Sequence, residues 1–309
     1  MAQYTVLGKT DLQTILTHYP VGKVVSYKIL SGGSENTNYL VNTENNAFVL
    51  TICEQKSQEE AKELASLLVY LQVNKFATSK LQKTKNAALI EVWNDKPVIL
   101  KEFIPGDIVE DIPENLIVYL GRELAKLHQI KAPDYLSDQL AYGTEHFDEV
   151  QTYAPDSTFY NWLKSMKNYI ENHISLELPK SLIHSDIFNN NIIIDKSGEF
   201  ATIMDFEEAC YYYRVFDIGM MIVGTCCEKE VVNLDKVVSL LKGYQQENKL
   251  LKIETDSLKV FTVYAATATA FWRHQNFNHI NIIPEKKEHY LAMKLLADAI
   301  MSMPDDDFV

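Results

Sequence analysis

One short segment of the sequence combines polar residue types that suit phosphoryl transfer. Asp186 lies two residues after His184 and five before Asn191, which gives the pattern His-x-Asp-x-x-x-x-Asn after the apolar pair Leu182-Ile183. A carboxylate can orient an attacking hydroxyl and accept its proton, while Mg²⁺ prefers hard oxygen ligands. We therefore predict that Asp186 is the catalytic residue and that Asn191 is a ligand of Mg²⁺. His184 is expected to pack and to hydrogen-bond, because the mechanism needs no imidazole base.

The residues after Asn191 predict a β-hairpin that supplies a second oxygen ligand. Residues 192–195 and 199–204 are suited to strands, and Lys196-Ser197-Gly198 between them is typical of a turn. Because Asn191 precedes the first strand and Asp205 follows the second, antiparallel pairing is expected to bring both to the open end of the hairpin. Asp205 is therefore the second predicted Mg²⁺ ligand. An exposed polar loop is the simpler alternative, and the adjoining hairpin and Asp205-Phe206 weigh against it.

The elements around this segment predict two lobes of different composition. Before residue 103, strand patterns at Val24–Leu30, 38–42, Ala47–Cys53, 87–92 and 97–103 accompany one long helix, whose start is marked by the capping box of Ser57 and Glu60. After residue 104, helical patterns dominate, at 113–129, 157–174, 231–247, 255–276 and 284–303. We predict an α+β fold with a β-rich nucleotide-binding lobe over 1–103, a mainly helical catalytic and substrate-binding lobe over 104–309, and a hinge at about 102–107.

A polar loop between the first two strands is a candidate phosphate-binding segment. Its small or polar residues suit backbone N–H groups that cover phosphates. It matches neither a Walker A sequence nor a dinucleotide fingerprint, so an ordinary hairpin loop is the alternative. The predicted nucleotide-binding residues of this segment are Ser31, Gly32, Gly33, Ser34, Asn36 and Asn38.

The composition of the chain indicates which class of protein it belongs to and which kinds of partner are unsuited to it. The chain has 309 residues, of which 47% are hydrophobic and 23% charged, as in an ordinary globular protein. Its net charge of −13 disfavours nucleic acid as a partner and is compatible with a cationic or zwitterionic substrate. No apolar run of about eighteen residues and no secretory signal pattern are present, so neither a membrane segment nor export is expected. The four cysteines, which are Cys53, Cys210, Cys226 and Cys227, form no C-x-x-C motif and predict reduced thiols in the cytoplasm.

These residues resemble the aminoglycoside phosphotransferase and choline kinase group of small-molecule kinases, which share the protein-kinase-like fold. The resemblance covers almost the whole chain and implies ATP and Mg²⁺ as cofactors. It implies that the Asp205-Phe206-Glu207 segment supplies the metal carboxylate and that Asp217 braces the catalytic loop, which spans residues 184–191. It also implies nucleotide contacts from Val49 and from the connector residues Glu102, Phe103 and Ile104.

Within this group, the sequence is most similar to bacterial homoserine kinases. The segments that carry this likeness are residues 33–39, 48–54, 186–188, 224–228 and 267–273. The likeness implies an acceptor with a primary hydroxyl, an ammonium and a carboxylate. Glu207 or Glu208 is a candidate partner for the ammonium, and Arg273 for the carboxylate. A position on the helix surface is the alternative for Arg273.

One departure from the wider group concerns the phosphate-binding cation. Thr51 stands where many kinases of this fold carry a lysine on the third strand, so the source of positive charge over the phosphates is open. This departure motivates one alternative, a non-catalytic nucleotide-binding protein that kept the fold. The presence of Asp186, Asn191 and Asp205 argues against it.

Other acceptors remain open at this point, namely choline, ethanolamine, a sugar or an aminoglycoside. A protein kinase is disfavoured, because no Ala-Pro-Glu-like segment follows Asp205 and Cys210-Tyr211-Tyr212-Tyr213 comes almost at once. The oligomeric state is not indicated by any pattern in the sequence.

Overall fold

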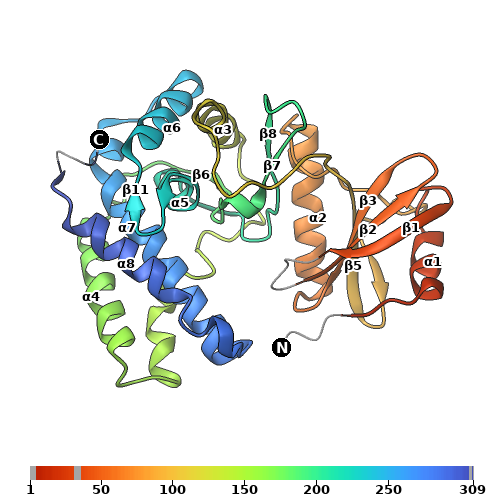
Figure 1. The fold of residues 1–309 in the computed structure, drawn as a ribbon, viewed down its shortest axis with the longest axis horizontal. Helices are drawn as coiled ribbons and strands as arrows, with labels where there is room; N and C mark the ends of the chain where they lie inside the picture. The colour runs from red at the N-terminus through yellow and green to blue at the C-terminus, as the bar shows by residue number, and fades with distance from the viewer. Residues whose placement is uncertain (1–4, 31–35, 306–307, 309) are drawn as a thin grey trace. The chain divides into compact units, whose positions relative to one another are not determined.

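The computed structural model describes residues 5–30, 36–305 and 308, and the chain divides into two compact units (Figure 1). The N-terminal unit comprises Ala2–Gly106 together with the short segment Met204–Phe206. The C-terminal unit comprises Asp107–Ile203 and Glu207–Val309. Each unit contains its own regular elements and its own buried residues.

The N-terminal unit is built on a five-stranded antiparallel sheet with the order β1-β2-β3-β5-β4. Its register pairs Asn38 with Thr51 and Val49 with Lys101. Side chains of directly opposed residues point to the same face of a sheet, so these four share one face. The strands are β1 (Val24–Leu30), β2 (Asn36–Thr43), β3 (Ala47–Cys53), β4 (Glu91–Trp93) and β5 (Lys96–Glu102).

Two helices lie on opposite sides of this sheet (Figure 1). The predicted long helix is confirmed as α2 (Gln58–Val73), and both hydrogen bonds of its Ser57–Glu60 capping box are present. A second, shorter helix, α1 (Lys9–Thr17), was not predicted. Its apolar residues join the core on the sheet face that carries Tyr39, Leu50 and Leu100. Nine residues with only three buried positions give too weak a periodic signal to identify such a helix from sequence.

The C-terminal unit is mainly helical, as predicted. Helix α7 is buried along most of its length and packs against α5 and α8, while α3 packs against α6. In the described part of the chain, no helix combines the length and the apolar character needed to cross a membrane. The α-helices of this unit are α3 (Glu114–Leu127), α4 (Thr158–His173), α5 (Arg214–Thr225), α6 (Leu234–Glu247), α7 (Lys252–Gln275) and α8 (Tyr290–Ser302).

Short strand pairs flank residues 184–191 in this unit. Strand β6 (Lys180–Ile183) pairs with β9 (Cys210–Tyr213). The predicted hairpin is confirmed as β7 (Ile192–Ile194) and β8 (Ala201–Ile203). Gly198 in its turn has a φ of 71°, a conformation that glycine adopts without the steric cost of a Cβ atom.

Two predicted helices begin later than their sequence patterns suggested. The helix predicted from residue 231 starts at Leu234, because Val231–Val232 (β11) pairs instead with Cys227–Glu228 (β10). The pattern from residue 284 contains a 3-10 turn before α8 begins at Tyr290. Strand β9 and helix α5 were not predicted. Helix α5 is buried on almost every side, and a short, nearly continuous apolar run of this kind fits a buried strand as well as a helix.

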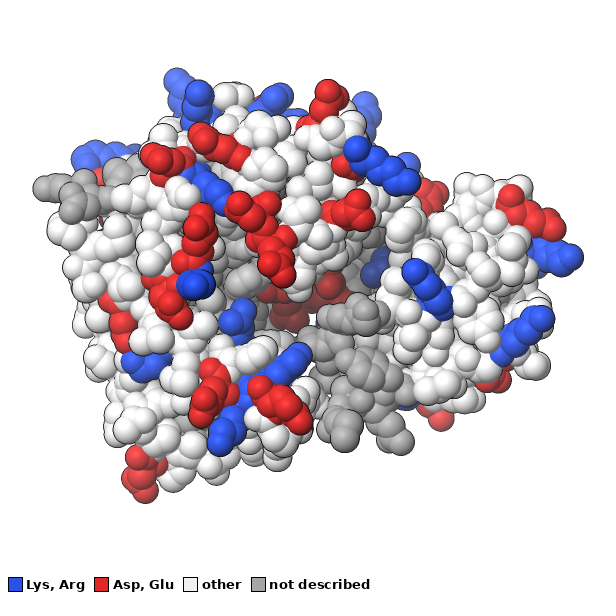
Figure 2. Space-filling model, viewed as in Figure 1, with Lys and Arg blue, Asp and Glu red and all other residues white. Residues whose placement is uncertain are grey.

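Charged side chains of both signs are interspersed over the face of the molecule that Figure 2 shows. No patch of a single charge sign stands out among the described residues on this face.

Candidate active site

The structure brings Asp186 and Asn191 together at one end of the catalytic loop. A 3-10 turn at Asn189–Asn191, with the N–H of Asn191 donating to the carbonyl of Phe188 at 2.9 Å, folds the loop back on itself. The side-chain Nδ2 of Asn191 then donates to the carboxylate Oδ2 of Asp186 at 2.9 Å and to its backbone carbonyl at 2.8 Å. The amide nitrogen of Asn191 is thus bonded to Asp186. The carbonyl oxygen of the same side chain, Oδ1, is the atom that can bind a cation.

The environment of Asp186 shifts the pKa of its carboxylate. Burial is the largest influence and raises the pKa of Asp186 above its usual value. His184, the hydrogen bond from Asn191 and the positive charge of Arg273 each act in the opposite direction. A buried carboxylate with a raised pKa is a stronger base than a solvated one, while the three opposing groups favour its ionised form.

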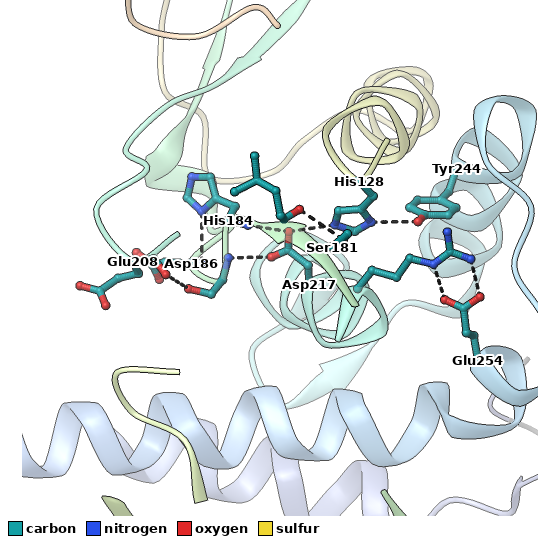
Figure 3. A network of polar contacts seen from close by, with 11 residues as sticks. His128, Ser181, His184, Asp186, Glu208, Asp217, Tyr244 and Glu254 are labelled. Atoms are coloured by element: carbon teal, nitrogen blue, oxygen red, sulfur yellow. Dashed lines mark hydrogen bonds and ion pairs between the residues drawn. The ribbon is translucent and has the colours of Figure 1, made fainter. Parts of the chain in front are cut away.

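Asp217 holds the backbone immediately before Asp186. This carboxylate belongs to α5 and is fully buried. Its Oδ2 accepts the N–H of His184 at 2.8 Å, and its Oδ1 accepts the N–H of Ser185 at 2.7 Å (Figure 3). Both carboxylate oxygens are therefore used to orient two successive peptide groups of the catalytic loop.

Ser185 has a strained backbone that its neighbours maintain. Its φ is 66°, in the left-handed region that non-glycine residues rarely occupy, and the residue is fully buried. Its hydroxyl donates to the carbonyl of Glu208 at 2.7 Å, and its carbonyl accepts the hydroxyl of Tyr142. Such a conformation costs about 1–3 kcal/mol and persists only where surrounding contacts impose it. Here those contacts direct the residue that follows, which is Asp186.

Helix α5 also approaches the loop through Gly224. A Cβ atom at this position would lie 2.0 Å from the backbone oxygen of Ile187. Only glycine permits this approach, so the backbone of α5 supports the loop both through Asp217 and through direct packing.

Arg273 contacts the catalytic loop from α7. Its guanidinium lies 5.7 Å from the centroid of the Phe188 ring, and Nη1 donates to the carbonyl of His289 at 3.4 Å. Burial lowers the pKa of Arg273, and the charge of Asp186 raises it. The side chain is partly buried and lies against the segment that carries Asp186, which favours the predicted role over a fully exposed arginine on the helix surface.

The candidate ammonium ligands lie in the segment between β8 and β9. Glu207 and Glu208 are both partly buried, and the backbone carbonyl of Glu208 is bonded to Ser185. Figure 3 draws the side chain of Glu208 directed away from the Asp217 network.

The second predicted metal ligand, Asp205, belongs to the segment Met204–Phe206 of the N-terminal unit. It is exposed and has a φ of 70°, a strained conformation that is typical of functional positions. The pairing of Ile192 with Ile203 sets Asn191 just before the hairpin and Asp205 just after it along the chain. Among the described residues, no three His, Cys, Asp or Glu side chains gather into a metal site. An amide oxygen from Asn191 and a carboxylate from Asp205 are donor types that suit Mg²⁺. This ion commonly takes one or two protein oxygens and completes its shell with phosphate and water.

Part of the predicted nucleotide site can be placed in the N-terminal unit. Asn36 is buried at the start of β2, and Asn38 Oδ1 accepts the hydroxyl of Thr51 at 2.7 Å. Val49 lies opposite Lys101, a cation on the same sheet face that sequence patterns did not single out. Only the strand register reveals this position. The predicted residues Ser31, Gly32, Gly33 and Ser34 lie outside the described residues.

The connector residues already use some of their backbone donors. The N–H of Glu102 donates to the carbonyl of Lys80 at 2.8 Å, and the N–H of Phe103 donates to that of Ala47 at 3.0 Å. A base edge recognised by this connector would therefore rely on other groups, namely the N–H of Ile104 and the backbone carbonyls.

Sequence reasoning missed three residues that support the catalytic loop. Tyr142 bonds to the backbone carbonyl of Ser185. His128 bonds to Asp217, and Tyr244 bonds in turn to His128 (Figure 3). They come from distant parts of the chain and form no motif with one another. No signal in a single sequence would have identified them.

The sequence has similarity to known phosphotransferases over most of its length. Residues 26–247 match the profile of the phosphotransferase enzyme family, APH. A homoserine kinase of Chelativorans sp. (strain BNC1) is 29% identical over 274 residues, which cover 84% of this chain and 82% of that protein. A homoserine kinase of Agrobacterium fabrum is 26% identical over 275 residues, which cover 85% of this chain and 84% of that protein.

Solved structures share the fold at lower sequence identity. The amicoumacin kinase hAmiN, in complex with AMP-PNP and Ca²⁺, has a TM-score of 0.74 at 18% identity, covering 98% of both chains. A microcompartment-associated aminopropanol kinase has a TM-score of 0.72 at 17% identity, covering 97% of this chain and 99% of that one. These likenesses confirm the predicted α+β, bilobal protein-kinase-like fold.

Proposed function

We propose that this chain, which belongs to the phosphotransferase enzyme family, transfers the γ-phosphoryl group of ATP to the hydroxyl of homoserine. Its class of reaction follows from the family: it is a small-molecule kinase whose acceptor is an alcohol. The observation that carries the assignment of its chemistry is the partly buried pairing of Asp186 with Asn191 beside the positive charge of Arg273.

Asp186 is the residue to which we assign the acceptor hydroxyl. As the bond forms between the substrate oxygen and the γ-phosphorus, the bond to the β-γ bridging oxygen breaks and ADP leaves. The hydroxyl proton passes to the carboxylate of Asp186, whose pKa is raised by burial. Asn191 orients this carboxylate through its amide nitrogen. His184 and Asp217 support the loop that carries it.

We assign Asn191 and Asp205 as the protein ligands of Mg²⁺. The Oδ1 of Asn191 and the carboxylate of Asp205 are the hard oxygen donors that this ion prefers. When bound, Mg²⁺ supplies positive charge to the phosphate oxygens. The hydrogen bonds from Asn191 to Asp186 keep the amide from turning, so that its oxygen stays available.

The nucleotide is assigned to the N-terminal unit. We propose that backbone groups of the loop at Ser31, Gly32, Gly33 and Ser34 cover the phosphates, with Asn36 and Asn38 at its end. Val49 would contact the base, and the connector at Glu102, Phe103 and Ile104 would recognise its edge. ADP and AMP-PNP in structures of the same fold support nucleotide binding.

Two observations support homoserine as the acceptor. Curated relatives that cover most of this chain are homoserine kinases. In addition, Arg273 places a guanidinium near Asp186, where it can bind the carboxylate of an amino acid whose hydroxyl faces Asp186. Glu207 or Glu208 would then face the ammonium group. Choline and ethanolamine carry no carboxylate and would leave Arg273 without its partner.

The decisive experiment is an acceptor panel with the purified chain, ATP and Mg²⁺. Product formation would be followed by mass spectrometry with homoserine, 3-aminopropan-1-ol, choline, ethanolamine, a sugar and an aminoglycoside. We expect homoserine to be phosphorylated fastest. 3-Aminopropan-1-ol, which is homoserine without its carboxylate, should be a much poorer acceptor. Turnover of choline without turnover of homoserine would refute the proposed substrate and leave the class of reaction intact.

A further inference from the structure

Two buried side-chain atoms, and no others in the described part of the chain, lack a hydrogen-bond partner. They are the amide nitrogen Nδ2 of Asn276 and the carbonyl oxygen Oδ1 of Asn189. Each belongs to a residue close to the contact between Arg273 and the ring of Phe188, because Asn276 is three residues beyond Arg273 and Asn189 follows Phe188. Buried polar groups are nearly always paired, and exceptions occur at functional sites and where water or an ion binds. The two atoms therefore indicate a place for a polar ligand beside the catalytic loop.

Asn276 continues the last helical turn of α7, which also contains Arg273. Its N–H donates to the carbonyls of Arg273 and Trp272, and its φ of −64° and ψ of −48° are helical. Side chains three residues apart in a helix lie on the same face, with Cβ atoms about 5–6 Å apart. The amide of Asn276 is therefore a neighbour of the arginine whose guanidinium lies against the catalytic loop.

A π-helical turn at Asn276–Ile280 determines which atoms of Asn276 are already used. The N–H of Asn281 donates to the backbone carbonyl of Asn276 at 2.7 Å, across five residues. The side-chain Nδ2 of Asn281 donates to Asn276 Oδ1 at 2.8 Å. One residue thus binds both oxygens of Asn276, and only the donor Nδ2 is left for a ligand. Single π-helical turns of this kind are frequent at functional sites.

A second amide in the same turn has the opposite arrangement. Asn278 Nδ2 donates to the carbonyl of His274 at 3.1 Å and to the carbonyl of Lys287 at 3.0 Å. An amide nitrogen carries two hydrogens, so both donors of Asn278 are used inside the protein. Asn278 therefore serves to hold the turn, whereas the side-chain nitrogen of Asn276 contributes nothing to it.

We propose that Asn276 is a specificity-determining residue, whose Nδ2 donates to the carboxylate of the acceptor beside the guanidinium of Arg273. This inference rests on the proposed function and deepens it. A carboxylate has two oxygens with about four lone pairs, so it can accept from a guanidinium and from an amide at once. A hydrogen bond to a charged group is stronger where water is excluded, and Asn276 is buried. Acceptors without a carboxylate give this donor no partner.

Replacing Asn276 by Leu tests the donor, because the two side chains are of similar size and Leu cannot hydrogen-bond. We expect the KM for homoserine to rise about 10–100-fold, as for the loss of a hydrogen bond to a charged group. The kcat should stay within about threefold of the parent value, since this contact is made equally in the ground state and the transition state. The KM for 3-aminopropan-1-ol should not change, because this acceptor has no carboxylate. An unchanged KM for homoserine would overturn the proposal.

Asn278→Leu is the matched control for damage to the π-helical turn. It removes two hydrogen bonds to backbone carbonyls and should lower the free energy of unfolding, measured in urea, at least as much as Asn276→Leu. The KM for homoserine should nevertheless stay at the parent value. An equal rise of this KM in both variants would assign the effect of Asn276 to the loss of the turn and refute its role in specificity.

Replacing Asn276 by Asp tests which group of the acceptor lies at this position. The carboxylate keeps an acceptor for Asn281 and puts a negatively charged oxygen in place of the donor. Repulsion should raise the KM for homoserine at least as much as in Asn276→Leu, while the KM for 3-aminopropan-1-ol should stay constant or fall. A lower KM for homoserine in Asn276→Asp would show that the position faces the ammonium group, and the proposal would fail.

Binding of 2-aminobutanoate separates this inference from the proposed function. This amino acid is homoserine without its hydroxyl, so it carries the carboxylate and cannot be phosphorylated. Isothermal titration calorimetry should give a Kd about 10–100-fold higher for Asn276→Leu than for the parent protein. If this difference appeared and homoserine were not phosphorylated, the proposed function would fail and the inference would stand. If homoserine were phosphorylated but 2-aminobutanoate bound equally to both proteins, or to neither, the inference alone would fail.

Discussion

The side-chain amide of Asn191 donates to both the backbone carbonyl and the carboxylate of Asp186, so that one residue orients the other. The five-residue spacing between them is bridged by a single 3-10 turn. The proposed cation ligand is thereby linked directly to the proposed acceptor of the substrate proton. Changes at either position should affect both metal use and proton transfer.

Replacing Asp186 by Asn should reduce kcat by about 10²–10⁴-fold, because the amide cannot accept the hydroxyl proton. ATP affinity, measured by isothermal titration calorimetry, should change little, since the change removes no proposed nucleotide contact. Asp134→Asn is the matched control, because Asp134 is almost fully exposed and makes only a 3.8 Å surface pair with Lys131. If Asp186→Asn turned over substrate as fast as the parent protein, Asp186 would have no part in the reaction.

Replacing Asn191 by Ala should move the acidic limb of the pH–rate profile to higher pH. The hydrogen bond from Asn191 lowers the pKa of Asp186, so its loss leaves that pKa higher. Activity needs the ionised carboxylate and declines as the pH falls through this pKa, so the decline should begin at a higher pH in the variant. The measurement is kcat/KM as a function of pH at saturating Mg²⁺. An acidic limb that stays at the same pH or moves to lower pH would refute the influence of the Asn191 hydrogen bond on Asp186.

The same variant should also need more Mg²⁺ for half-maximal activity. Loss of the amide oxygen removes one of two proposed protein ligands, whereas Asn189→Ala removes an amide of the same loop that bonds to the carbonyl of Glu110. A titration of activity against Mg²⁺ should therefore separate the two variants. An identical Mg²⁺ dependence in the parent and in Asn191→Ala would exclude Asn191 as a ligand.

Replacing Arg273 by Met should raise the KM for homoserine about 10–100-fold, as expected for the loss of a charge-assisted contact of about 1.5–3 kcal/mol. The KM for 3-aminopropan-1-ol should stay nearly constant, because this acceptor has no carboxylate. Arg122→Met is the control, since Arg122 forms a partly exposed pair with Glu247 at 3.4 Å. If both acceptors lost affinity equally, Arg273 would have a general role in the site and not one in selecting a carboxylate.

Replacing Gly224 by Ala should destabilise the protein by about 1–3 kcal/mol, the usual cost of forcing extra atoms into a packed interior. The added Cβ would fall 2.0 Å from the oxygen of Ile187, so either α5 or the catalytic loop must move. Urea unfolding measures the free energy of unfolding of the variant, and kcat reports whether the catalytic loop has moved. Gly8→Ala provides the comparison, since its Cβ would meet only Asp11 Oδ2 at 3.2 Å. Unchanged stability and kcat in Gly224→Ala would show that the close approach does not matter.

The catalytic loop and its hairpin could be predicted because their signals are local. The spacing of His184, Asp186 and Asn191 lies within eight residues, and the strands that follow are separated by one turn that ends in glycine. By contrast, α1 and α5 were missed for opposite reasons. Helix α1 is short and has only three buried positions, whereas α5 is buried on nearly every side, and its short apolar run fits a buried strand as well as a helix.

The sequence alone was enough to predict the class of chemistry, since carboxylate and amide oxygens at a set spacing suit phosphoryl transfer wherever the chain folds them. Which distant residues contact the catalytic loop depends instead on how the helices pack. Arg273 reaches Phe188 of the loop from α7, and His128 and Tyr244 come together because α3 packs against α6, which leaves His128 free to bond to Asp217 of α5. Contacts between residues a hundred positions apart arise from packing of whole helices. No periodicity in a single sequence records them.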